Sequence, residues 1–89
     1  MRRRYLVHGE VQGVGFRYFA WRLATRLGLT GWVRNLPDGS VEALADGDPV
    51  DLTRFEAELR RGPPMASVTS VQSGQTPSEN ERFDSFEIQ

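Results

Sequence analysis

The stretch Gly9-Glu10-Val11-Gln12-Gly13-Val14-Gly15-Phe16-Arg17 decides the fold, because it separates a short apolar run from a segment of helical periodicity. Upstream, residues 5–8 read Tyr-Leu-Val-His and are bounded by Gly9, which predicts a first strand. Downstream, apolar residues recur at the spacing of a helix with one buried face: Phe16, Phe19, Ala20, Leu23, Ala24 and Leu27. Gly28 is placed to end that helix. The stretch is therefore predicted to be a strand-to-helix loop.

Further along the chain, residues 30–35 and 40–45 are predicted as a second and a third strand. The residues between them, Leu36-Pro37-Asp38-Gly39, have turn chemistry at every position. A second helix follows, with Asp48 as its N-cap and Pro49 as its first residue. Its buried face is predicted to consist of Leu52, Phe55 and Leu59, and it ends before Gly62 and two prolines.

The last third of the chain gives weaker signals. Residues 66–72 are predicted as a fourth strand, although their apolar residues do not alternate strictly. Residues 74–82 are predicted as a polar loop. Phe86 and Ile88 alternate with polar neighbours, which predicts a short final strand.

The predicted order is β-α-β-β-α-β with a short strand at the end. Two helices, each with one apolar face, must cover one face of a sheet, so residues 1–89 are expected to form a single α+β domain. Right-handed crossovers place strands one and three side by side at the centre. The predicted fold is a two-layer ferredoxin-like sandwich, with a mostly antiparallel sheet and two helices on one face.

The glycine-rich stretch is also a candidate anion site. Glycine allows a ligand to approach the backbone closely, and the start of a helix presents unpaired N–H groups and partial positive charge. Phosphate is the usual ligand of such a site, and Arg17 would add a planar cationic donor. The spacing alone fits a plain turn with a surface arginine equally well.

Composition excludes several classes of chemistry. The chain has no cysteine, no lysine and one histidine, which removes thiolate nucleophiles, Schiff bases and His-pair metal sites. The net charge of −1 gives duplex nucleic acid no obvious target, and the cluster Arg2-Arg3-Arg4 is expected to be a solvated chain end. No apolar run approaches the ~20 residues that span a membrane, so a cytoplasmic location is expected.

Three groups of residues resemble the acylphosphatase family. They are the stretch from Gly9 to Arg17, the segment Leu27-Gly28-Leu29-Thr30-Gly31-Trp32-Val33-Arg34-Asn35, and Asp38-Gly39-Ser40-Val41-Glu42. Gly62-Pro63 with Ala66, and the closing Phe86-Glu87-Ile88, extend the resemblance to the end of the chain. The chain differs at Glu10, where many relatives have a basic or neutral residue.

The resemblance implies a hydrolase without metal or cofactor that splits acyl phosphates into a carboxylate and inorganic phosphate, which is both product and inhibitor. It implies that Arg17 binds the phosphoryl group and that Asn35 orients the attacking water. The phosphate cradle would comprise Gln12, Gly13, Val14, Gly15, Phe16 and Arg17. The expected enzyme is a monomer that acts on a small molecule and binds neither nucleic acid nor a membrane. An acyl phosphate suits such a site, because its carboxylate leaving group needs no general acid.

Two alternatives remain at this point. One is a stand-alone module that binds acyl phosphates, like the N-terminal domain of the carbamoyltransferases of hydrogenase maturation. The other is a ferredoxin-like domain that binds RNA or a regulatory metabolite, for which Tyr5 and Trp32 are the candidate stacking residues on central strands. Whether Asn35 reaches the glycine loop depends on the stagger of the sheet. Arg34, its neighbour, is expected to point to the opposite face and to be solvated.

Overall fold

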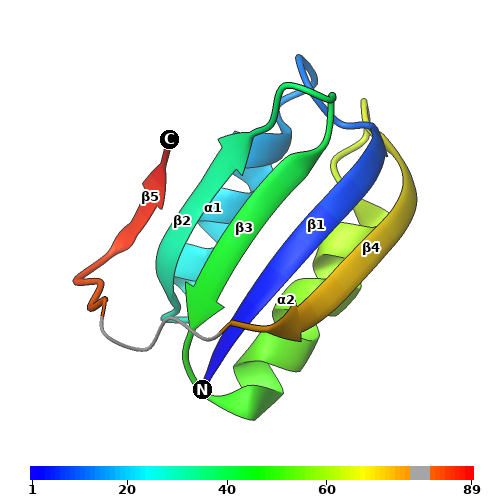
Figure 1. Ribbon diagram of the computed structural model, residues 1–89. Helices are drawn as coiled ribbons and strands as arrows, with labels where there is room; N and C mark the ends of the chain where they lie inside the picture. Colours follow the sequence, from blue (N-terminus) through cyan, green and yellow to red (C-terminus); the bar gives the residue numbers. More distant parts are fainter. Residues whose placement is uncertain (77–80) are drawn as a thin grey trace.

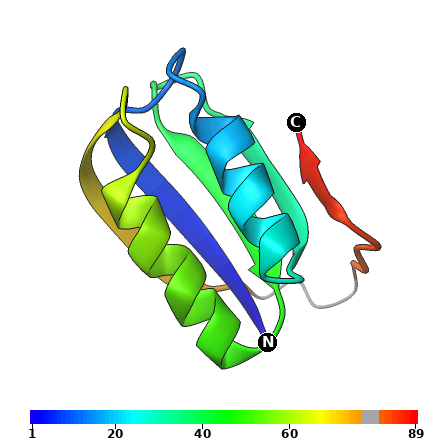
Figure 2. The same ribbon diagram turned by 180° about the vertical axis from the view of Figure 1, so that it is seen from behind.

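The computed structural model describes residues 1–76 and 81–89, and folds them into a five-stranded sheet with two helices against one face (Figures 1 and 2). The elements in chain order are β1 (Arg2–Glu10), α1 (Phe16–Arg26), β2 (Thr30–Asn35), β3 (Val41–Asp46), α2 (Pro49–Arg61), β4 (Ser67–Gln75) and β5 (Phe86–Ile88). The strand order is β4-β1-β3-β2-β5. Neighbouring strands are antiparallel except for β2 and β5, which are parallel. The predicted α+β sandwich, with strands one and three adjacent, is confirmed.

The two helices bury the faces that their periodicity predicts. In α1, Phe16, Ala20, Leu23 and Ala24 are buried, while Phe19 and Leu27 are partly buried against the same core. In α2, Leu52, Phe55 and Leu59 have no exposed surface. The Asp48 side chain accepts a hydrogen bond of 3.0 Å from the Val50 amide, which confirms it as the N-cap of α2.

Tyr5 lies at the centre of the core between the sheet and α2. It is fully buried, it meets the Phe55 ring edge-on at 5.4 Å, and its hydroxyl donates to the Leu52 carbonyl at 3.2 Å. Burial raises the pKa of Tyr5 to about 12, so the ring stays neutral. Tyr5 is therefore unable to stack on RNA, and the Arg34 guanidinium covers Trp32 at 4.6 Å. Of the two stacking residues of the RNA-binding alternative, Tyr5 is inaccessible and Trp32 already has a guanidinium over its ring.

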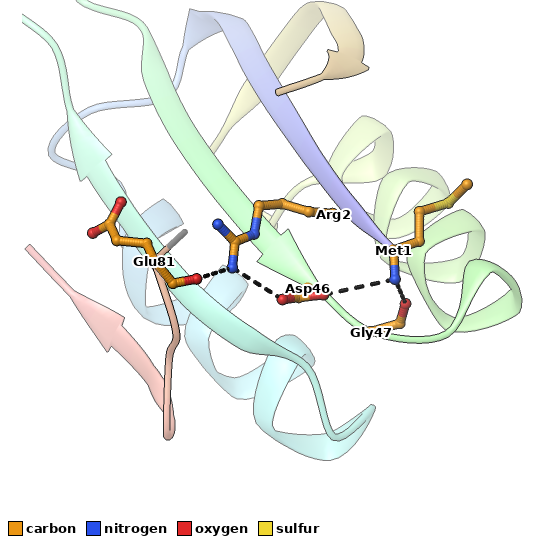
Figure 3. A network of polar contacts seen from close by, with 5 residues as sticks. All are labelled: Met1, Arg2, Asp46, Gly47 and Glu81. Atoms are coloured by element: carbon orange, nitrogen blue, oxygen red, sulfur yellow. Dashed lines mark hydrogen bonds and ion pairs between the residues drawn. The ribbon is translucent and has the colours of Figure 1, made fainter. Parts of the chain in front are cut away.

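β1 begins at Arg2, three residues before the predicted strand, and the expectation of a solvated arginine cluster is wrong. The side chain of Arg2 is only 9% exposed and forms an ion pair with Asp46 at 3.1 Å. It also donates to the Glu81 carbonyl, while the terminal amine of Met1 donates to the Gly47 carbonyl at 3.1 Å (Figure 3). Cross-strand pairing with β3 therefore orders the start of the chain.

The outer face of the sheet contains a buried carboxylate between two arginines. Glu42 on β3 is 5% exposed and accepts hydrogen bonds from Arg4 on β1 and from Arg34 on β2, the latter at 2.7 Å. Burial raises the pKa of Glu42, but the two guanidinium groups outweigh it and hold that pKa below its ordinary value. Arg34 does point away from the helices, as alternation requires, but it is paired rather than merely solvated. The Arg4–Glu42–Arg34 cluster joins the three central strands.

β4 extends three residues beyond its predicted end and reaches Gln75, so the predicted polar loop begins later than residue 74. The middle of that loop, residues 77–80, lies outside the described residues. β5 occupies the predicted residues, and Phe86 packs edge-on against Phe55 at 5.9 Å. The end of the chain therefore lies beside β2, the strand that ends at Asn35.

The substitution Glu42→Gln is expected to lower the free energy of unfolding at pH 7 by about 2 kcal/mol, because it removes the charge that pairs with two arginines. The folded pKa of Glu42 is lowered, so the stabilisation is complete above its ordinary pKa of 4.5 and is lost as the pH falls through the lower folded value. The free energies of unfolding of the two proteins, measured with urea, should therefore converge at acid pH. The control is Glu56→Gln, which breaks only the surface pair with Arg60 and should cost about 0.3–0.5 kcal/mol. Equal losses in the two variants would contradict a special role for Glu42.

Candidate active site

The loop between β1 and α1 depends on two glycines in a left-handed conformation. Gly13 and Gly15 have φ angles of +75° and +79°. No heavy atom lies within 4 Å of the position that a Cβ would occupy on either residue, so the requirement is conformational rather than one of space. Gly15 is also the N-cap of α1, and no side chain caps this helix start.

The backbone amides of this loop have no acceptor in the part of the chain that the structure describes. None of the N–H groups of residues 12–18 donates a hydrogen bond to another residue within the described ranges. At the first turn of a helix this is intrinsic, because no preceding turn supplies carbonyls. Unpaired N–H groups and the positive end of the helix dipole together favour an anion at this position.

A pocket of about 240 Å³ opens beside these amides. Its walls come from the loop, the first turn of α1, the end of β2 and the end of β5: Val11, Gly13, Gly15, Phe16, Arg17, Tyr18, Asn35 and Ile88. The structure thus places Arg17 and Asn35 in the same pocket as Gly13, Gly15 and Phe16. Of the residues expected in the phosphate cradle, Gln12 and Val14 do not line it. Val14 packs against the core instead.

Asn35 carries a buried oxygen that no described residue satisfies. It is the last residue of β2, and its Oδ1 atom is buried without a hydrogen-bond partner in the described part of the chain. An unpaired buried acceptor costs about 1–3 kcal/mol, and native structures contain few of them. In a polar pocket, such an atom is suited to accept a hydrogen bond from a water molecule or a ligand.

Arg17, on the first turn of α1, is held in place by the end of the chain. Its Nη1 atom donates to the main-chain oxygen of Gln89 at 2.8 Å, directly after Ile88, which lines the same pocket. A guanidinium group has five N–H donors in a rigid fork, so one can anchor the side chain while others face the pocket. Residues 17 and 89 meet because β5 pairs with β2.

The side chain of Gln12 has a role that the sequence did not reveal. Its Nε2 atom donates to the carbonyl oxygens of Leu36 and Ser40, at 2.7 and 2.9 Å, in the turn between β2 and β3. In Figure 1 this turn and the β1–α1 loop lie next to each other at one end of the sheet. Both carbonyls also accept a backbone hydrogen bond within the turn, from the Gly39 and Leu36 amides, so nothing in the sequence marks them as partners of Gln12. The Gln12 side chain thus fastens the loop to the hairpin that positions Asn35.

The turn itself is closed by Asp38. The Ser40 amide donates to its Oδ1 atom at 3.0 Å, and the Ser40 hydroxyl donates to the same atom. The hydrogen bonds from the hydroxyl and the amide of Ser40 hold the pKa of Asp38 below its ordinary value. The turn chemistry predicted for residues 36–39 therefore supplies a rigid base for the Gln12 contact.

The arrangement of loop, arginine and asparagine agrees with a family-level match that covers almost the whole chain. Residues 3–88 match the family model described as Acylphosphatase. The chain belongs to the acylphosphatase family. A protein from Archaeoglobus fulgidus named "Acylphosphatase" is 46% identical to it over 82 residues, which are 92% of this chain and 90% of that relative.

Solved structures of acylphosphatases have the same fold. The crystal structure of acylphosphatase from Bacillus subtilis superimposes with a TM-score of 0.91 at 39% identity, and the match covers 98% of this chain and 96% of that one. The crystal structure of T. kodakarensis HypF contains a similar unit, with a TM-score of 0.86 and 31% identity. That match covers all of this chain but only 12% of HypF, so the acylphosphatase fold also occurs as a small part of a longer chain.

The substitution Gln12→Glu is expected to detach the loop from the hairpin, because a carboxylate cannot donate to the Leu36 and Ser40 carbonyls and is repelled by them. Stability should fall by about 1–2 kcal/mol, and amide hydrogen exchange should accelerate in the β2–β3 turn. The control Gln72→Glu makes the same chemical change on an exposed position of β4. If both variants exchange like the parent protein, the Gln12 side chain does not hold the hairpin.

Proposed function

We propose that the protein hydrolyses the carboxyl–phosphate bond of acyl phosphates and releases a carboxylate and inorganic phosphate. One observation carries the proposal: a run of backbone N–H groups, for which the described residues supply no acceptor, lies next to Arg17 in a pocket that Asn35 also lines. Family membership supports the same reaction.

The loop amides and Arg17 would bind the phosphoryl oxygens. Phosphoryl transfer passes through a loose transition state, in which charge is spread over the three non-bridging oxygens. Donors that are already in position stabilise this charge without reorganisation, which is usually the largest single contribution to catalysis. The hydrogen bond from Arg17 to Gln89 fixes the guanidinium before the substrate arrives.

Asn35 would orient the attacking water. Its buried Oδ1 can accept a hydrogen bond from the water, which aims a lone pair of the water oxygen at phosphorus. The new P–O bond forms as the bond from phosphorus to the acyl oxygen breaks, and the acyl group leaves as a carboxylate with the electron pair of that bond. The proton of the water passes to a phosphoryl oxygen of the substrate. A carboxylate is a stable leaving group, so no general acid is required.

The reaction as proposed needs a single chain and no cofactor or metal, and we propose that the protein is a monomer. We also propose that it acts in the cytoplasm. No helix in the described ranges is long and apolar enough to cross a membrane.

The experiment that tests the function is hydrolysis of benzoyl phosphate by the purified protein, with and without a chelator and inorganic phosphate. The rate should not change with chelator and should fall as phosphate competes for the loop.

Arg17→Lys should lower kcat/KM by about 100-fold or more, because an ammonium group keeps the charge but loses the planar donor fork of the guanidinium. Arg54→Lys, on the exposed surface of α2, is the matched control. Near-parental turnover by Arg17→Lys would remove Arg17 from its role, and inhibition by chelator that Mg²⁺ reverses would contradict the metal-free reaction.

Asn35→Ala should separate chemistry from phosphate binding. We expect kcat to fall by about 100-fold or more, because the water loses its position, while the inhibition constant of inorganic phosphate changes by less than about threefold. Steady-state kinetics with phosphate as inhibitor measures both quantities on one preparation. A parallel loss of kcat and of phosphate affinity would mean that Asn35 binds the phosphoryl group rather than the water.

A further inference from the structure

A second hollow adjoins the phosphate pocket, on the helical side of the molecule. It has a volume of about 300 Å³ and lies between α1 and the end of α2 with the two prolines that follow. Figure 2 shows the start of α1 and the end of α2 at the same end of the molecule as the β1–α1 loop. The lining residues are Gly15, Tyr18, Phe19, Arg22, Leu23, Arg26, Glu58, Pro63 and Pro64, and we call this hollow the helix groove.

The helix groove adjoins the phosphate pocket and shares two lining residues with it. Gly15 and Tyr18 line both. Gly15 has no side chain to separate the two spaces, and no heavy atom lies within 4 Å of the position its Cβ would take. The part of a ligand that extends from a phosphoryl group in the pocket can therefore enter the groove across Gly15.

The walls of the helix groove are apolar near the phosphate pocket and cationic along α1. Phe19, Leu23 and the two prolines provide the apolar surface. Arg22 and Arg26 lie one turn apart, and neither forms an ion pair or hydrogen bond with any residue in the described ranges. The guanidinium of Arg22 lies over the Tyr18 ring at 5.8 Å. The carboxylate in the lining, Glu58, is paired with Arg61 at 3.4 Å.

These two cations contrast with most arginines of the sheet and of α2. Arg2, Arg4, Arg34, Arg60 and Arg61 each pair with a carboxylate. Arg26 lies in the last turn of α1, where a cation stabilises the helix dipole, but Arg22 lies mid-helix, and like charges one turn apart destabilise a helix slightly. The lining thus holds two arginines and one carboxylate, Glu58, which is paired with Arg61; this excess of positive charge favours an anionic ligand.

We propose that the helix groove binds the acyl part of the substrate, and that Arg22 and Arg26 select acyl groups with a negative charge of their own at the far end. This inference rests on the proposed function, because it places the phosphoryl group in the adjoining pocket. The substrate class is then the monoacyl phosphates of dicarboxylic acids and other acyl phosphates with a second anionic group.

The dimensions of α1 agree with this assignment. Gly15, Arg22 and Arg26 are separated by seven and by four residues, so they share one face of α1. At about 1.5 Å per residue, Arg22 lies about 10.5 Å and Arg26 about 16.5 Å along the helix from Gly15. Side chains on a helix lean towards its N-terminus, which brings both guanidinium groups nearer to the pocket. Arg22 can therefore meet a short acyl group, and Arg26 a longer one.

The test compares substrates of equal length that differ only at the far end. Succinyl phosphate and butyryl phosphate each have four acyl carbons, and adipoyl phosphate and hexanoyl phosphate each have six. The readout is the ratio of kcat/KM for the charged member of a pair to that for the uncharged member. We expect the double variant Arg22→Gln/Arg26→Gln to lower this ratio about fivefold at low salt, and the difference to shrink as salt screens the charges. Glu58→Gln should raise the ratio, because it removes a competing negative charge from the groove.

Arg82→Gln is the charge-matched control, since Arg82 is exposed and lines neither the helix groove nor the phosphate pocket. Its ratio should equal that of the parent protein. If all four substrates are hydrolysed and the kcat/KM ratio of charged to uncharged substrate is the same in the parent protein and the double variant, the groove assignment is overturned and the proposed function still stands. Failure to hydrolyse any of the four would overturn both.

Discussion

The backbone N–H groups of the β1–α1 loop have no acceptor among the described residues, and the proposed phosphate site requires that they stay unpaired. The chain builds its two helix starts differently. Asp48 caps α2 through a hydrogen bond to the Val50 amide, whereas α1 starts at Gly15 without a side-chain cap. A cap contributes about 1 kcal/mol to helix stability. A capping side chain at α1 would gain that stability and would occupy the donors that an anion needs.

A loop that cannot bond to itself has to be held from outside. The apolar residues Val11 and Phe16 anchor its two ends in the core. The Gln12 side chain binds the hairpin, and the end of the chain binds Arg17. These supports come from segments far apart in the sequence, so the site forms only when the sheet has formed.

The elements defined by local chemistry could be predicted from the sequence. Glycine, proline and N-cap signals fixed α2 and β2 to the residue, and the apolar spacing gave the buried face of α1. Contacts between residues far apart in the sequence could not be predicted in this way. Arg2 and Arg34 looked like surface charges, because the carboxylates that bind them, Asp46 and Glu42, come from another strand. The shared pocket of Arg17 and Asn35 also depends on strand register, and the anchor of Arg17 depends on β5, which a single sequence does not place.

β2 separates two tasks by the alternation of its side chains. Arg34 faces outward and joins the Glu42 cluster, which holds the central strands together. Asn35, the next residue, lies on the helix-facing side and keeps a buried oxygen without a partner among the described residues. An unsatisfied acceptor lowers stability, and a fold optimised only for stability would replace it with an apolar group. The Glu42 cluster secures β2 without any contact to the pocket. The strand can therefore tolerate an unsatisfied polar atom at Asn35, which the proposed reaction would pair with the attacking water.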